Sequence, residues 1–152
     1  MDAIIARDGK PVFEDTEPAE CGEGEALVRV RLAGDVPASV LASSESSSDG
    51  LVLGRDVVGM VSEVADDAPN GVRDRLLKSR VVCSPYIARG TCDMCRAGVS
   101  QHCRHGGIMG RGDIPGSLGG TISVPWRNLT LVPDTLDDAV ALLAGPLGRA
   151  VH

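Results

Sequence analysis

Short runs of apolar residues recur along the first 135 positions and predict a protein built mainly of β-strands. Residues 26–32 place apolar side chains on one face and Arg29 and Arg31 on the other, which is the alternation of a half-buried strand. Residues 57–64 are apolar on both faces apart from one serine and one glutamate, so we expect a strand at the centre of a sheet. Gly59 within this run indicates a bulge or a close approach of two backbones.

Turn dipeptides and further apolar runs extend the same pattern. Asp8-Gly9 is a strong hairpin turn, and it predicts that residues 2–7 and 11–14 pair as two short strands. Three more strands are expected over residues 80–83, 120–124 and 129–132.

The period of the pattern changes only near the end of the chain. Thr135, followed by acidic residues, is the expected N-cap of a helix over residues 136–143. Gly145-Pro146 is expected to interrupt it, leaving a second short helical piece over residues 147–152. The apolar face of this tail has no obvious partner in the sequence.

Two loops of different character separate the strands. Residues 43–50 contain no apolar side chain and are expected to be solvated, whereas residues 90–119 form a much longer connection. Loops of that length normally need something to hold them. A bound metal is one such device, because closing a long loop offsets chain entropy.

Composition narrows the classes of function. The chain has 152 residues, enough for one domain over 1–152 and short for two. Its net charge of −6 and its scarce aromatics, Phe13, Tyr86 and Trp126, argue against nucleic-acid partners. No apolar run approaches the length of a membrane helix, and no leader follows Met1, so a cytoplasmic protein without membrane contact is expected.

Cysteine spacing provides the strongest candidate chemistry. Cys92, Cys95 and Cys103 are spaced C-x2-C-x7-C around a glycine. In a reducing compartment such a cluster favours metal ligation, and zinc takes thiolates at this spacing. A redox CxxC would need a thioredoxin-like setting that the sequence lacks. Cys21 and Cys83 are isolated, and we expect a surface loop thiol and a buried small apolar residue respectively.

Five segments together resemble the N-terminal domain of zinc-type alcohol dehydrogenases, in the medium-chain dehydrogenase/reductase superfamily. The resemblance covers essentially the whole chain and rests on residues 25–34, 53–64, 80–103, 119–134 and 144–152, which read EALVRVRLAG, LGRDVVGMVSEV, the cysteine segment, GGTISVPWRNLTLVPD and AGPLGRAVH. It implies a GroES-like, partly open β-barrel with a cysteine-rich lobe and a C-terminal helix. The implied activity is NAD(P)-dependent oxidation or reduction of a small alcohol or carbonyl compound.

In that family NAD(P) binds to a Rossmann domain that follows the barrel, and the family commonly forms homo-oligomers through it. We find no G-x-G-x-x-G after a strand in this chain. Gly106-Gly107 and Gly110 lie inside the cysteine loop, where turns explain them better than dinucleotide binding. We therefore expect this chain to lack the cofactor domain, either as a fragment or as a natural short protein, and to be inactive alone.

The resemblance also implies where a catalytic zinc would bind, and the ligands are missing there. The family's cysteine, histidine and glutamate positions are occupied by Val36, Arg55 and Gly145, and the proton-relay hydroxyl by Ala38. Valine and glycine offer no ligand atom, and arginine cannot lose its proton to become one. No catalytic residue and no catalytic zinc are expected. Arg55 and Asp56 either form a buried pair that fills the space of the metal or point to opposite strand faces.

The family's structural zinc site resembles C-x2-C-x2-C-x7-C, and Arg89 stands at its first position. Cys92, Cys95 and Cys103 match the other three. A zinc held by these thiolates, with water, His102 or His105 as fourth ligand, and an empty lobe both remain open. Arg89 repels a dication but also favours thiolates.

Three functions follow as hypotheses. The first is the substrate-side domain of an alcohol-dehydrogenase-like oxidoreductase. The second is a binding or assembly module that kept the barrel and lost the chemistry. The third is a small zinc protein whose lobe contacts a partner.

Overall fold

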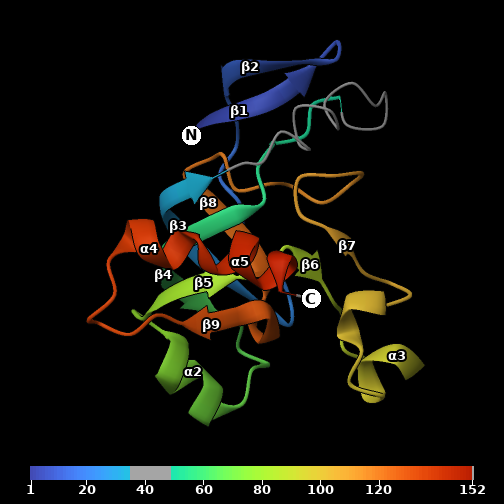
Figure 1. Cartoon of the computed structure of the whole chain (residues 1–152), viewed down its shortest axis with the longest axis vertical. Helices are drawn as coiled ribbons and strands as arrows, with labels where there is room; N and C mark the ends of the chain where they lie inside the picture. Colours follow the sequence, from blue (N-terminus) through green and yellow to red (C-terminus); the bar gives the residue numbers. More distant parts are fainter. Residues whose placement is uncertain (35–48, 152) are drawn as a thin grey trace.

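A computed structural model describes residues 1–34 and 49–151. Its main element is an antiparallel five-stranded sheet in the order β8-β3-β4-β5-β9, accompanied by two two-stranded sheets (Figure 1). The described strands do not close into a complete barrel, so the expected mainly β, partly open architecture is confirmed.

The N-terminal hairpin forms as predicted. Strand β1 (Asp2–Arg7) pairs with β2 (Lys10–Asp15), and the two turn residues, Asp8 and Gly9, have φ of 48° and 74°. Two positive φ angles are the requirement of a type I′ turn, which explains why this dipeptide gives a tight hairpin. Backbone bonds from Ile4 to Leu118 and from Leu53 to Ile4 tie the hairpin to the long loops.

Strand β4 (Asp56–Val64) lies at the centre of the main sheet, as its apolar pattern predicts, and pairs with β3 (Glu25–Gly34) along most of its length. A Cβ on Gly59 would lie 2.5 Å from the carbonyl oxygen of Arg29. The glycine therefore permits the close backbone approach that its position in the run indicates.

The larger apolar cluster lies on one face of this sheet and consists almost entirely of aliphatic side chains, and a second cluster of Val58, Val132 and Ala141 lies on the other face. Strands β5 (Arg80–Cys83), β8 (Thr121–Pro125) and β9 (Leu129–Leu131) complete the sheet close to their expected bounds. Cys83 is buried in the larger cluster, and burial raises the pKa of its thiol to about 12. It is the inert apolar residue expected from the sequence, whereas Cys21 is half-buried in the loop before β3.

The helices depart most from expectation. Helix α2 (Asn70–Leu76) has no side-chain cap and buries only Leu76, so its sequence carries no strong helical signal. At the tail, the N-cap of α4 (Asp138–Leu142) is Asp137 rather than Thr135, and Asp137 Oδ1 accepts a hydrogen bond from the Val140 amide at 2.9 Å.

Helix α5 (Ala144–Ala150) corrects a second expectation, because Gly145-Pro146 lies inside its first turn. Proline is tolerated there because the first amide groups of a helix have no partner within the helix. The break between α4 and α5 falls at Leu143, two residues before Gly145, and both helices lie over the face of the sheet opposite the larger cluster (Figure 1). No helix of the described residues is long and apolar enough to cross a membrane.

The long loop folds into a lobe at one side of the sheet (Figure 1). A small ladder between β6 (Tyr86–Ile87) and β7 (Gly107–Ile108) forms its base. Helix α3 (Asp93–Arg96) and the 3-10 turn η2 (Ser100–His102) form its tip, and a second such turn, η3 (Trp126–Asn128), precedes β9. The predictions for Val36, Ala38 and most of the polar loop lie outside the described residues, as does His152.

Candidate metal centre

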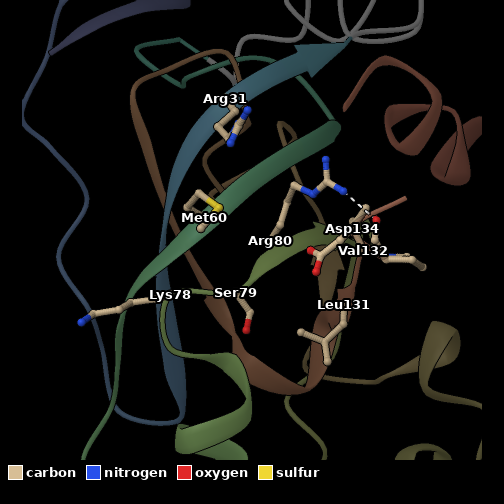
Figure 2. Close-up of a pocket in the computed structure, with 9 residues that line it drawn as sticks. Arg31, Met60, Lys78, Ser79, Arg80, Leu131, Val132 and Asp134 are labelled. Atoms are coloured by element: carbon tan, nitrogen blue, oxygen red, sulfur yellow. Dashed lines mark hydrogen bonds between the residues drawn. The ribbon is translucent and has the colours of Figure 1, made fainter. Parts of the chain in front are cut away.

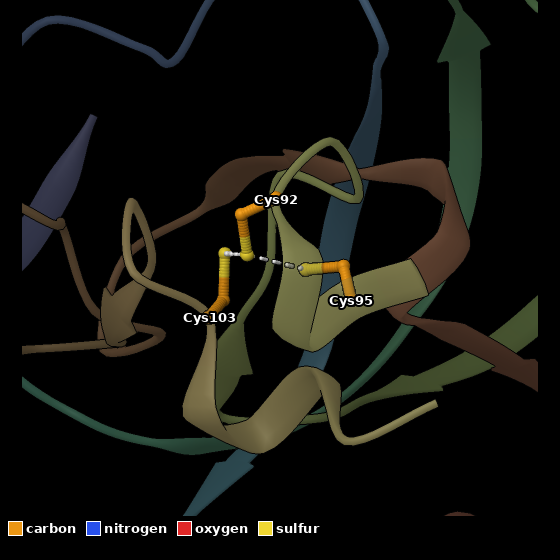
Figure 3. Close-up of side chains that lie close together, drawn as sticks. All are labelled: Cys92, Cys95 and Cys103. Atoms are coloured by element: carbon orange, nitrogen blue, oxygen red, sulfur yellow. Dashed lines mark hydrogen bonds between the residues drawn. The ribbon is translucent and has the colours of Figure 1, made fainter. Parts of the chain in front are cut away.

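The lobe brings together the three cysteines that the sequence singled out. Cys92 precedes α3, Cys95 lies within it, and Cys103 follows η2. The Cys92 Sγ lies 3.5 Å from that of Cys95 and 3.9 Å from that of Cys103, and all three sulfurs lie within 4.8 Å of one another (Figure 3). Four thiolates at about 2.3 Å from a tetrahedral zinc lie roughly 3.8 Å apart. The donor set therefore fits three corners of a zinc site.

Local backbone geometry favours a thiolate at the centre of this group. Backbone N–H groups of Cys95 and Arg104 lower the pKa of the Cys92 thiol to about 6. Burial and the neighbouring sulfurs raise the pKa of Cys95 instead. A bidentate pair between Arg104 and Asp93, with N–O distances of 2.8 and 3.0 Å, holds the segment after Cys103 against α3.

Arg89, at the position of the family's remaining ligand, makes its contacts with backbone and arginine groups of the lobe and of η3. Its Nε donates to the carbonyl oxygen of His105 at 3.2 Å, and its own carbonyl accepts from Arg127 at 2.7 Å. His102 and His105 are not members of the ligand group that the described residues form. Among the described residues, no histidine, carboxylate or fourth cysteine joins the three sulfurs as they stand.

An ion pair lies at the start of β4, near the positions where the family resemblance implies a catalytic metal. The Asp56 carboxylate is buried, with 4% of the residue exposed. Arg149 of α5 donates to both of its oxygens, Nη1 to Oδ1 at 3.0 Å and Nη2 to Oδ2 at 2.9 Å. This pairing raises the pKa of Arg149 and joins two segments that are 93 residues apart in the chain.

Because Gly145 has no side chain, there is space beside it for this ion pair. A Cβ at position 145 would lie 2.2 Å from Asp56 Oδ1 and 3.5 Å from Arg149 Nη1. The space into which any side chain at residue 145 would project is filled by the carboxylate and its guanidinium partner. A glutamate at this position cannot coexist with the pair as it stands.

Arg55 takes no part in the pair. Among the described residues, its Nε is buried and has no hydrogen-bond partner. The prediction of a buried ion pair is therefore correct for the Asp56 carboxylate and wrong for its partner, which is Arg149 instead of Arg55. The sequence offered no signal for that choice, because the two residues meet only through the packing of α5 on the sheet.

A further cavity of about 670 Å³ opens on the face of the sheet beside α4 (Figure 2). Two arginines that line the cavity pair with the Asp138 carboxylate, which accepts from Arg31 Nε at 2.8 Å and from Arg80 Nη1 at 2.9 Å. Arg80 also donates to the backbone carbonyls of Pro133 and Leu136. These arginines fix the start of α4 on the sheet, and none of the candidate metal ligands lines the cavity.

Comparison with known proteins establishes the family. Residues 22–134 match the alcohol dehydrogenase GroES-like domain. The chain belongs to this family, as the barrel segments and the cysteine spacing indicated.

Relatives and solved structures agree with this assignment. L-threonine 3-dehydrogenase of Idiomarina loihiensis is 29% identical over 160 residues, which cover 100% of this chain and 46% of that protein. The enzyme of the same name from Chelativorans sp. is 36% identical over 103 residues, covering 67% of this chain and 28% of the relative. Alcohol dehydrogenase TADH from Thermus sp. ATN1 superposes with a TM-score of 0.82 at 27% identity, covering 95% of this chain and 44% of that one. The chain thus spans less than half the length of these relatives.

Proposed function

We propose that this chain is the substrate-side domain of an alcohol-dehydrogenase-like oxidoreductase in which an ion pair replaces the catalytic zinc. The observation that carries the proposal is the bidentate contact between Asp56 and Arg149 over Gly145. The guanidinium is a fixed cation where the family resemblance implies a metal ion. It balances the buried carboxylate, which would otherwise carry a large desolvation cost.

The chemistry of the remaining positions supports the same conclusion. Arg55 is always protonated and cannot bind a metal. Gly145 has no ligand atom, and its neighbouring space is filled by Asp56. A zinc ion activates a substrate oxygen only when about three protein ligands hold it and one position stays open. With Val36 at the third position, none of the three positions that the family resemblance implies carries a ligand side chain.

Zinc in this domain is assigned to the lobe, with Cys92, Cys95 and Cys103 as ligands. Their sulfur separations fit tetrahedral coordination, and three of the four family positions are retained. When bound, the ion supplies a cross-link that closes the loop between β6 and β7. It has no catalytic role here.

The proposed activity also requires a substrate and a hydride-carrying cofactor. A small alcohol or carbonyl substrate and NAD(P) are the partners that the family implies, with the cofactor held by a Rossmann domain beyond the single domain over 1–152. L-threonine 3-dehydrogenase relatives make a hydroxylated small molecule the first substrate class to test. Because the family binds its hydride carrier on a Rossmann domain, we expect residues 1–152 alone to show no turnover.

The residues at the three catalytic-ligand positions, Val36, Arg55 and Gly145, also favour one alternative function. In it the chain is a binding or assembly module that retains the fold. The two functions differ in the reading frame of the gene. An oxidoreductase continues beyond residue 152 into a strand and a glycine-rich turn, whereas a module of this size stops there. A homo-oligomer is compatible with both.

Metal stoichiometry tests the site assignment. We expect about one zinc per chain by elemental analysis of the purified 152-residue protein, and none in the Cys95→Ser variant. Asp56→Asn should leave the zinc content unchanged, because that residue is not a ligand. Two zinc ions per chain would refute the loss of the catalytic site, and none in the unmodified protein would refute the lobe assignment.

A further inference from the structure

The lobe retains three metal ligands and leaves the fourth corner without one. Arg89 stands where the fourth thiolate is expected, and its side chain is held to the His105 carbonyl. Neither histidine of the lobe, nor any carboxylate among the described residues, joins the three sulfurs. A zinc ion held by these three sulfurs would keep one position open to water or to another ligand from solution.

A cavity adjoins the cluster at one of its three cysteines. It has a volume of about 480 Å³ and lies between the lobe and the sheet, and Cys95 is part of its wall. Gly90, Gln101 and Arg127 also line it. This volume falls within the range of small-molecule sites and is too small for a folded protein partner.

Charge in this region selects the kind of ligand. The residues that line the cavity include one arginine, Arg127, and no carboxylate, although the chain as a whole carries a net charge of −6. Arg127 lies at the cavity wall, stacked over Trp126 at 4.9 Å from the ring centroid. The place of Arg127 depends on Gly90, because a Cβ there would lie 1.6 Å from Arg127 Nη1. An anion is therefore favoured in this cavity.

We propose that the metal-loaded lobe binds a low-molecular-weight anionic thiol, whose sulfur completes the coordination shell. Sulfur is the donor that three thiolates and zinc most readily accommodate as a fourth ligand. The thiol binds as its thiolate and its proton passes to solvent, so no oxidant is required. This inference rests on the assignment of a metal to Cys92, Cys95 and Cys103.

Cobalt(II) substitution tests the inference by spectroscopy, without any measurement of activity. Cobalt bound to three thiolates gives a sulfur-to-metal charge-transfer band, which should grow in a saturable way when glutathione is added. The Arg89→Cys variant supplies the fourth sulfur internally. It should show the four-sulfur spectrum at once and no response to glutathione.

A second variant examines the cationic wall. Arg127→Gln should weaken glutathione binding about five-fold and leave the uncharged 2-mercaptoethanol unaffected, as expected for one partly exposed ion pair. Cys103→Ser, which lacks a ligand, controls for complexes of cobalt and thiol in solution. A wild-type spectrum that glutathione does not change would overturn the inference while leaving the lobe metal intact. Failure of cobalt to bind would instead refute the metal assignment and the inference with it.

Discussion

Arg149 donates two hydrogen bonds, at 3.0 and 2.9 Å, to the buried carboxylate of Asp56. This contact joins the first residue of the central strand to the last helix of the domain. It gives α5, which exposes Leu147 and is followed by the exposed Val151, a polar anchor in place of a large apolar interface. The stability of the tail should therefore depend on this pair more than on the packing of the helix.

Removal of one partner tests that dependence. Arg149→Met leaves the Asp56 carboxylate buried without a cation, and we expect a loss of about 2–4 kcal/mol in the free energy of unfolding, measured in urea. The loss should fall below that of a fully buried pair, because the Arg149 side chain is 27% exposed. The double variant Asp56→Asn/Arg149→Met should recover part of it. Equal stability of Arg149→Met and the wild type would show that the pair does not anchor the helix.

Two glycines in the same helix provide a matched comparison. Gly145→Ala places a methyl group 2.2 Å from Asp56 Oδ1 and should destabilise the chain by about 1–3 kcal/mol, as overpacking does. Gly148→Ala meets nothing within 4 Å and should stabilise the helix by up to about 1 kcal/mol. Chemical denaturation of both variants gives the sign of each change. Similar effects of the two substitutions would contradict the crowding at residue 145.

The N-cap of α4 can be tested by comparing Asp137 with Thr135. Asp137→Ala removes the side chain that accepts from the Val140 amide and should cost about 1 kcal/mol. Thr135→Ala, at the position that the sequence favoured, should change the unfolding free energy by only a few tenths. Thermal unfolding of the two variants distinguishes the caps, and a larger loss for Thr135→Ala would contradict the observed helix boundary.

Stability of the metal-free chain should depend on pH through Cys92. Its pKa in the folded protein is about 6, below the roughly 8.5 of a free thiol. Because the folded state favours the thiolate, this contribution is complete above the ordinary pKa and is lost as the pH falls through 6. The stability difference between wild type and Cys92→Ser, measured under reducing conditions with chelator, should therefore shrink between pH 8 and pH 5.

Cys83 is the control for that measurement. Its folded pKa of about 12 keeps the thiol neutral throughout the range. The stability difference between wild type and Cys83→Ser should accordingly stay constant from pH 5 to pH 8. A flat profile for Cys92→Ser as well would show that the backbone N–H groups do not stabilise its thiolate.

Much of the fold could be predicted because its strands carry local signals. The hairpin turn at Asp8-Gly9 and the apolar run of β4 each define their element within a few residues. Helix α2 could not be predicted, because it is seven residues long and buries one leucine. The true cap was missed because threonine and aspartate are both good N-caps, and only the path of the backbone after Pro133 decides between them.

Of the two candidate sites, the cysteine cluster could be predicted from the sequence and the Asp56–Arg149 pair could not. Three cysteines within twelve residues meet through one short helix and one turn, so spacing alone is informative. The partner of Asp56 depends on how α5 packs against a strand 93 residues earlier in the chain. No local pattern records that contact, and a neighbouring arginine at position 55 was the more obvious candidate.

We propose that a guanidinium, and no metal ion, balances the buried carboxylate of Asp56 at the start of β4. Anomalous diffraction at the zinc absorption edge, from crystals grown with zinc, tests it most directly. We expect a single peak per chain, among the sulfurs of Cys92, Cys95 and Cys103. A peak between Asp56 and Gly145, with Arg149 displaced from the carboxylate, would contradict the claim.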